Sequence, residues 1–139
     1  EMLGKNLQDK AKVAEISGVV TDFFMALAPF FGMSNEEASA PMQKALDEKV
    51  VPKLKQIEAM IGEKKTFMSY LSKADFSIMT LVGFVMKMAG CAKCSVGEYP
   101  NIMRTMGNLA GQPKLKEYLE SPEHKLRPMM PPGMIKFSF

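Results

Sequence analysis

Asp22 is the first residue of this sequence whose type and surroundings suggest chemistry. It is the only charged residue in the run GVVTDFFMALAPFF, residues 18–31. A carboxylate among apolar neighbours is costly in free energy unless it has a partner. That partner could be the ammonium group of a bound ligand, or a Lys side chain or backbone amide of the same chain. The sequence leaves both alternatives open.

Cys91 and Cys94 form a CxxC pair, the spacing of a thioredoxin-type dithiol or of half a zinc site. The dithiol motif needs a strand-to-helix context, whereas this pair follows a helix stop at Gly90. Zinc needs two further ligands, but the chain has one His, His124, and no other Cys. We therefore interpret the pair as a loop dithiol and expect no metal. We expect His124 to be exposed and structural.

The stretch YLSKADFS, residues 70–77, places Asp75 at the start of the most apolar run in the chain. With Ser72 as the N-cap, the Ser hydroxyl would accept from the amide of Asp75, and the Asp carboxylate would accept from the amide of Ser72. Leu71 and Phe76 stand at the positions of a hydrophobic staple. A buried helix has no water for its first amides, so such acceptors are needed. We therefore predict a structural role for Ser72 and Asp75, and we assign no catalytic residue.

Apolar residues recur at steps of three and four along most of the chain, which predicts helices and no strands. A capping box from Ser34 to Glu37 opens a helix in which Pro52 predicts a kink and Gly62 a stop. The run FSIMTLVGFVMKMAG is too short for a membrane span and suits a helix buried on all sides. The expected helices cover about residues 8–31, 35–61, 76–90, 100–110 and 114–120.

This pattern predicts an all-α fold, a bundle of about five helices. The helical domain is expected over residues 1–121. The remaining tail, residues 122–139, is rich in Pro and Met, so we expect no regular helix in it. We expect the tail to pack on the domain or on a partner.

Composition places the chain among soluble globular domains. It has 139 residues, of which 47% are hydrophobic and 24% charged, enough for one domain with a real core. The net charge of +3, with Lys dispersed among Glu and Asp, argues against a nucleic-acid partner. No secretory signal pattern is present near Glu1, and the chain reads as a piece of something longer. Two Cys suggest a reducing compartment, so we expect a cytoplasmic location without membrane attachment.

Several motifs in order resemble the C-terminal helical domain of cytosolic glutathione transferases, with the pi and sigma classes nearest. They are the Ser72-Lys-Ala-Asp75 cap before an apolar helix, then Tyr99-Pro100, then QPKLKEYLESP at residues 112–122. Upstream, Leu3-Gly-Lys-Asn-Leu-Gln resembles the entry to the first long helix of that domain. The resemblance covers about residues 3–125. The chain departs from the family at Met68-Ser-Tyr-Leu71, where a Gly-Asp is common.

The resemblance implies a domain that performs part of a reaction. In this family a thioredoxin-like N-terminal domain binds glutathione as co-substrate and activates its thiol. The helical domain supplies the electrophile pocket, much of the dimer interface and a carboxylate that reaches glutathione bound by the neighbouring subunit. By position on the first helix, Asp22 matches that carboxylate. The implied pocket is lined by Met25, Pro29, Phe30 and Phe31. Four tail residues could fold over it: Met129, Met130, Ile135 and Phe137. Met25, Phe30 and the tail could equally serve as core and surface cover.

Two function classes therefore stay open. One is the helical half of a glutathione transferase, inactive without its thioredoxin-like domain. The other is a non-catalytic interaction module in a larger protein assembly, as related domains are in translation-factor and aminoacyl-tRNA synthetase complexes. The lone Asp22 favours the first class, because a scaffold has no glutathione to hold. A free-standing bundle that binds an unrelated protein would leave the order of motifs unexplained.

The first helix also predicts a second chain or domain. It has one apolar face with Val13, Ile16, Val20 and Leu27, and another with Val19, Met25, Ala26 and Pro29. A helix that is apolar on two sides must be buried on two sides. We therefore expect a thioredoxin-like domain, a homodimer partner or a larger assembly to cover the second face.

Overall fold

The computed structural model describes residues 2–87 and 96–126, and every regular element in these two stretches is helical. The expected all-α bundle is therefore confirmed. Its long elements are α1 (Leu7–Leu27), α2 (Asn35–Ala45), α3 (Val51–Ile61), α4 (Lys73–Lys87) and α5 (Pro100–Ala110). Short helices α6 (Pro113–Glu120) and α7 (Pro122–Leu126) follow, with 3-10 turns η1 (Ala28–Phe30) and η4 (Val96–Glu98) between elements. Cys91 and Cys94 lie outside the described residues.

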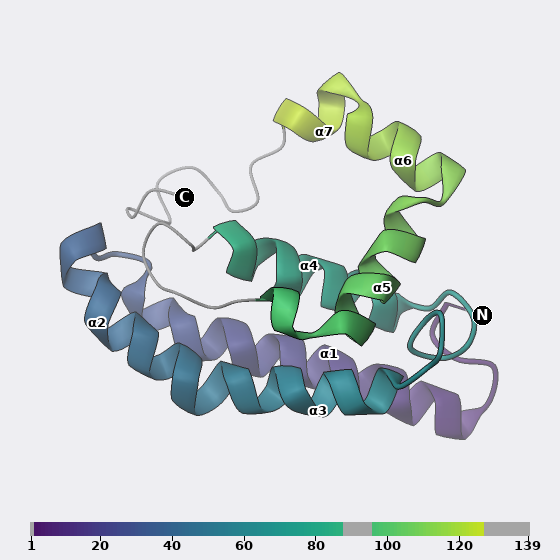
Figure 1. Cartoon of the computed structure of the whole chain (residues 1–139), viewed down its shortest axis with the longest axis horizontal. Coiled ribbons are helices and arrows are strands. Elements are labelled where there is room, and N and C mark those ends of the chain that lie inside the picture. Colours follow the sequence, from purple (N-terminus) through teal and green to yellow (C-terminus); the bar gives the residue numbers. More distant parts are fainter. Residues whose placement is uncertain (1, 88–95, 127–139) are drawn as a thin grey trace.

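The long helices form two layers (Figure 1). α1 runs alongside the continuous α2–α3 rod, and α4 and α5 form the second layer, with α4 packed on α1 and α5 on both α3 and α4. α6 and α7 stand off at the far side of α5 (Figure 1). Side chains from α1 to α5 meet in one core, whose largest fully buried members are Phe23, Phe84, Ile16, Leu27, Met42, Leu46, Leu54, Ile57, Ile61, Ile78 and Leu81.

An aromatic cluster holds α1 against α4. The ring of Phe84 lies 5.9 Å from that of Phe23 and 5.1 Å from that of Phe24, both edge to face. Phe31 joins from the turn after α1, with its centroid 6.0 Å from that of Phe84. Edge-to-face contacts of this kind add specificity to the burial of large apolar surfaces.

α2 and α3 form one rod because the joint between them is a π turn, η2 (Leu46–Val50). Pro52 has no amide to donate, and its ring would crowd the carbonyl four residues earlier in a regular α-helix. The wider turn absorbs this, and the amide of Val51 donates to the carbonyl of Leu46, five residues back. The rod begins with the predicted capping box, in which Ser34 and Glu37 bind each other's amides at 3.4 and 3.0 Å.

The start of α4 agrees with the sequence in one bond and differs in another. The carboxylate of Asp75 accepts from the amide of Ser72 at 2.9 Å, as predicted. The Ser72 hydroxyl, however, donates to that carboxylate at 3.0 Å, while the Asp75 amide donates to the Ser72 carbonyl. Two buried backbone donors therefore meet one carboxylate, because its other oxygen accepts from the amide of Phe67 at 2.8 Å. The Asp75 side chain therefore caps α4 and also fixes the loop before it.

Two expectations are wrong, one about the burial of α4 and one about helix in the stretch from Pro122. α4 is not buried on all sides within its described length, since Thr80 and Met86 are exposed. The stretch from Pro122 does contain a regular helix, α7, because Pro at the first helical position needs no amide partner there. The Ser121 hydroxyl accepts from the amide of His124 at 3.2 Å and so caps it.

The segment Leu7–Phe30 is long and apolar enough to cross a membrane by length and composition alone. A core helix of a soluble protein passes the same test, so this is weak evidence by itself. Only 28% of its most apolar window is buried within the chain. α1 therefore presents apolar surface on the side facing away from α4.

Candidate functional site

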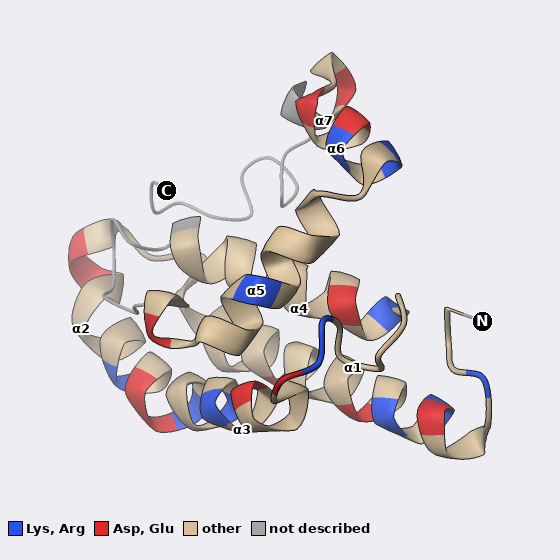
Figure 2. Cartoon of the chain, turned by 45° about the vertical axis from the view of Figure 1, so that its right-hand side comes forward, with Lys and Arg blue, Asp and Glu red and all other residues tan. Residues whose placement is uncertain are grey.

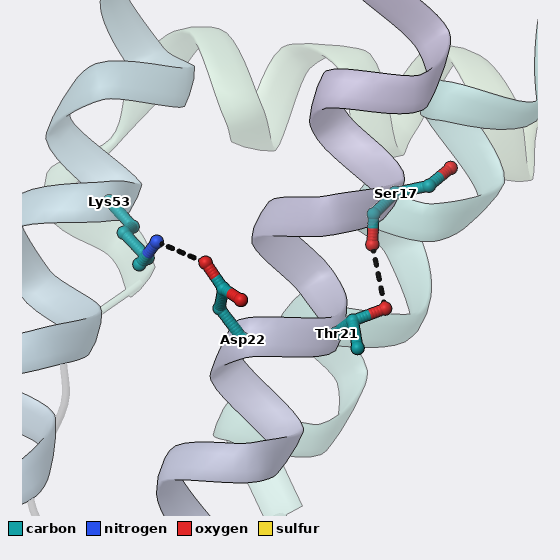
Figure 3. Close-up of polar contacts among 4 residues, drawn as sticks. All are labelled: Ser17, Thr21, Asp22 and Lys53. Carbon is teal, nitrogen blue, oxygen red and sulfur yellow. Dashed lines mark hydrogen bonds and ion pairs between the residues drawn. The ribbon is translucent and has the colours of Figure 1, made fainter.

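Asp22 lies on the outward side of α1, by which we mean the side away from α4. There it faces the α2–α3 rod. Its Oδ2 accepts from Lys53 Nζ at 2.8 Å, an ion pair between α1 and α3 (Figure 3). The side chain of Asp22 is 64% exposed and that of Lys53 is 33% exposed. This is the intrachain Lys alternative that the sequence left open. The expected desolvation cost is absent, because the Asp22 side chain is exposed while the adjacent Phe23 and Phe24 pack on Phe84.

The ion pair is held between two rigid helices. On the same stretch of α1, the Thr21 hydroxyl donates to the Ser17 carbonyl at 3.0 Å (Figure 3). The Ser17 hydroxyl donates to the Val13 carbonyl at the same distance. These hydroxyls are therefore engaged with the backbone of their own helix. An exposed ion pair contributes at most about 1 kcal/mol to stability. Lys53 thus positions Asp22 but adds little to the free energy of unfolding. Within the described residues, no donor bonds to Asp22 Oδ1.

An open hollow of about 550 Å³ surrounds this pair. Met25 and Ala26 of α1 form one wall, and Pro52 and Lys53 at the start of α3 form the opposite one. Glu48 and Lys49 complete its lining from the π turn. The hollow therefore combines an apolar wall with charges of both signs. It is a surface depression between two helices, with room for a partner's side chains or for part of a small ligand.

The four residues predicted to line an electrophile pocket separate into two groups. Met25 on α1, at 69% exposure, and Pro29 on η1 are exposed. Phe30 and Phe31 are half-buried and pack against the core. Of the four, Met25 alone lines the hollow beside Asp22. The structure thus brings Met25 together with Asp22, whereas Phe31 belongs with the aromatic cluster around Phe84 and Phe30 packs against the core.

Glu58 is a structural residue that the sequence reasoning missed. Its two carboxylate oxygens accept from the amides of Asn101 and Ile102 at 2.8 and 2.9 Å, across from α3 to the start of α5. A signal was present, because Tyr99 at the N-cap of α5 is not a capping residue type and its side chain makes no cap bond. A helix that begins without its own cap needs an acceptor from elsewhere. Sequence alone does not say which carboxylate supplies it.

Metal binding finds no support in residues 2–87 and 96–126, where no group of three or more His, Cys, Asp or Glu side chains could hold an ion. His124 packs its ring 5.1 Å from that of Tyr118, on the α6–α7 corner. It is half-buried there rather than exposed, and it serves the packing of two short helices.

The chain was compared with models of known protein families. The model of the family described as "Glutathione S-transferase, C-terminal domain" matches residues 21–122. This range contains Asp22, the α2–α3 rod, the α4 cap and the α5–α6 corner. A search of curated proteins found no match for the chain.

Proposed function

Because the chain belongs to the family of glutathione S-transferase C-terminal domains, we propose that it is the helical half of a glutathione transferase. In this proposal a thioredoxin-like domain binds glutathione and activates its thiol, and the present chain supplies the electrophile side and part of a dimer interface. The family match over residues 21–122 carries the proposal. Membership of the pi or sigma class is an extension of the same proposal, and it rests on the cap and QPKLKEYLESP motifs.

In this proposal the carboxylate of Asp22 binds glutathione that is held by a neighbouring subunit. Its exposure and its place on the outward side of α1 support this role, because an acceptor that serves another subunit must be reachable from outside. Lys53 holds one carboxylate oxygen, and Oδ1 remains for the α-ammonium group of glutathione. A carboxylate held in place by a second helix loses less conformational entropy on binding than a free one.

The electrophile side of the proposal rests on Met25 and Pro29. Met25 on α1 and Pro29 on η1 are both exposed and apolar, and Phe30 and Phe31 pack against the core. Adaptable Met side chains suit a surface that accepts varied hydrophobic compounds. Residues 127–139, which include Met129, Met130, Ile135 and Phe137, lie outside the described part.

The test joins the chain to the glutathione-binding domain of a glutathione transferase and measures conjugation of a nitroaromatic halide. We expect turnover by the joined protein and none by the 139-residue chain alone. Asp22→Asn should raise the KM for glutathione about fivefold, the equivalent of about 1 kcal/mol, with kcat nearly unchanged. The matched control, Asp47→Asn on the exposed side of the π turn, should leave both constants unchanged.

Two outcomes would count against this proposal. Glutathione-dependent turnover by the isolated chain would contradict the division of labour between domains. Wild-type KM in the Asp22→Asn variant would remove Asp22 from the glutathione site.

One observation favours a second candidate, a non-catalytic interaction module. Asp22 already has a partner in Lys53, so its presence does not require glutathione. In that case the joined protein would bind glutathione through the other domain alone. Substitution of Asp22 would then change neither affinity nor turnover, and the outer side of α1 would serve a protein partner.

A further inference from the structure

Three stretches distant in sequence meet at one end of the bundle, which we call the basic end: residues 2–12, 60–73 and 101–108. The amide of Lys73 donates to the carbonyl of Met2 at 2.8 Å, and Arg104 donates to the carbonyl of Lys64 at 2.9 Å. These stretches contain seven Lys or Arg residues and two Asp or Glu residues, although the whole chain has a net charge of only +3. Figure 2 shows the blue segments on the first turns of α1 and on the loop after α3. Positive charge is therefore concentrated at this end.

A hollow of about 400 Å³ lies within the basic end, on the opposite half of α1 from Asp22. Its apolar lining comes from Met60, Phe67 and Met68. Lys12 of α1 and Lys64 of the loop also line it, from two different elements. Phe67 is buried, whereas both Lys residues are exposed. The hollow thus has an apolar floor and cations at its rim.

Neither Lys12 nor Lys64 forms an ion pair with a residue of the described stretches. The Lys64 ammonium lies 5.6 Å from the centre of the Phe67 ring, so it stays over the hollow. The one acid that lines the hollow, Asp9, accepts from the Tyr70 hydroxyl at 2.6 Å. This bond holds the carboxylate in place without neutralising it, so the lining carries two positive charges against one negative charge. The two ammonium groups are in no ion pair of the described stretches and can face an outside anion.

The loop that presents Lys64 and Phe67 is held from several sides. The Arg104 guanidinium binds the carbonyls of Gly62 and Lys64, and the Asn108 amide group donates to the carbonyl of Lys65 at 2.9 Å. The amide of Phe67 is bound by the buried carboxylate of Asp75. A surface that is ordered before binding loses less entropy when it binds. The hollow is therefore preorganised.

We propose that the basic end is a docking surface for an acidic segment of another protein. An apolar side chain of that segment enters the hollow over Phe67, and flanking carboxylates face Lys12 and Lys64. Charge complementarity selects an anionic partner. The floor of the hollow lies below its charged rim, so it fits one protruding apolar side chain with carboxylates on both sides. A peptide supplies this combination, whereas a flat lipid surface or a phosphate backbone does not. The proposal is independent of glutathione chemistry.

The test measures fluorescence anisotropy of a labelled eight-residue peptide in which Asp and Glu surround one Phe, titrated with the 139-residue chain at low salt. We expect saturable binding that weakens as salt is added. Replacing Phe by Ser in the peptide should weaken binding severalfold. The double variant Lys12→Glu with Lys64→Glu should weaken it by at least tenfold.

The matched control is Lys114→Glu with Lys116→Glu on α6, which makes the same change in net charge at exposed positions outside the basic end. It should change affinity less than twofold. Equal losses in the two double variants would mean that only net charge attracts the peptide, and they would overturn the proposal. Absence of binding at millimolar peptide would overturn it too. So would tighter binding to anionic vesicles or duplex DNA that the Lys12 and Lys64 substitutions abolish.

Discussion

At the scale of residues, two carboxylates hold together segments that are far apart in the chain. Asp75 binds the amides of Ser72 and Phe67, and so fixes the start of α4 and the loop before it. Glu58 binds the amides of Asn101 and Ile102, and so fixes α5 on the end of α3. In both cases a charged acceptor meets two backbone donors, which makes a stronger bond than a neutral pair. These two residues should therefore matter more for stability than any exposed ion pair.

Asp75→Ala should lower the free energy of unfolding by about 2–4 kcal/mol, because it leaves two backbone amides without an acceptor at a position where Asp75 is 1% exposed. Urea denaturation followed by circular dichroism measures this. Asp47→Ala, at an exposed position, should change stability by less than about 0.5 kcal/mol. Equal stability of the Asp75 variant and the wild type would contradict the structural role.

Glu58→Ala should loosen the first turn of α5 before it unfolds the domain. We expect the amides of Asn101 and Ile102 to lose hydrogen-exchange protection, with a loss of about 1–3 kcal/mol in global stability. Glu58→Gln keeps the length of the side chain and one acceptor oxygen, so its effect should be smaller. If exchange at these two amides is unchanged in Glu58→Ala, another group must cap α5.

Local spacing allowed the Ser72–Asp75 contact to be predicted, because its members are three residues apart and a capping pattern has a fixed geometry. The same spacing says nothing about Phe67, Lys53 or Asn101, whose bonds depend on how loops and helices pack. Asp22 illustrates the limit. Its isolation among apolar residues suggested a buried charge, but the periodicity of α1 places it on the outward side beside Lys53.

At the scale of elements, the helical period accounts for most of what could be predicted. The bounds of α1, of the α2–α3 rod and of α5 and α6 agree closely with the apolar spacing. The π turn could not be specified, although Pro52 indicated an irregularity, because a kink and a wider turn both accommodate Pro. The short helix α7 was missed because Pro122 was treated as an interruption rather than as a first helical residue.

Two glycines provide a matched test of these elements. Gly62 ends α3 at φ 54° and ψ −134°, a conformation that side-chain-bearing residues rarely adopt. Gly62→Ala should therefore destabilise the domain by about 1–3 kcal/mol. Gly18 lies in the exposed interior of α1 with no atom within 4 Å of an added Cβ. Gly18→Ala should stabilise by about 0.5–1 kcal/mol. Thermal unfolding of both variants measures the difference, and the same sign for both would contradict the assigned conformations.

At the scale of the whole molecule, α1 is covered on one side only. Of the first apolar face, Val13, Ile16 and Leu27 are buried against the rest of the bundle, as predicted, and Val20 is half-buried. On the second face Val19 and Ala26 are half-buried, while Met25 and Pro29 are exposed. Large exposed apolar patches are uncommon on monomeric proteins. We therefore predict that a second body covers this face, whether a domain, another protein or another copy of the chain.

The isolated 139-residue chain should self-associate through this face. Sedimentation velocity should show a dimer or larger species whose proportion rises with concentration, because burial of apolar surface stabilises association by about 25 cal/mol per Å² before its entropic costs. Met25→Lys places a charge at the centre of the face and should shift the distribution to monomer. Met103→Lys, at an exposed position on α5, should leave it unchanged. A wild-type chain that remains monomeric at high micromolar concentration would show that the outer side of α1 needs no partner. Association that persists in Met25→Lys but is lost in Met103→Lys would place the contact on α5 instead.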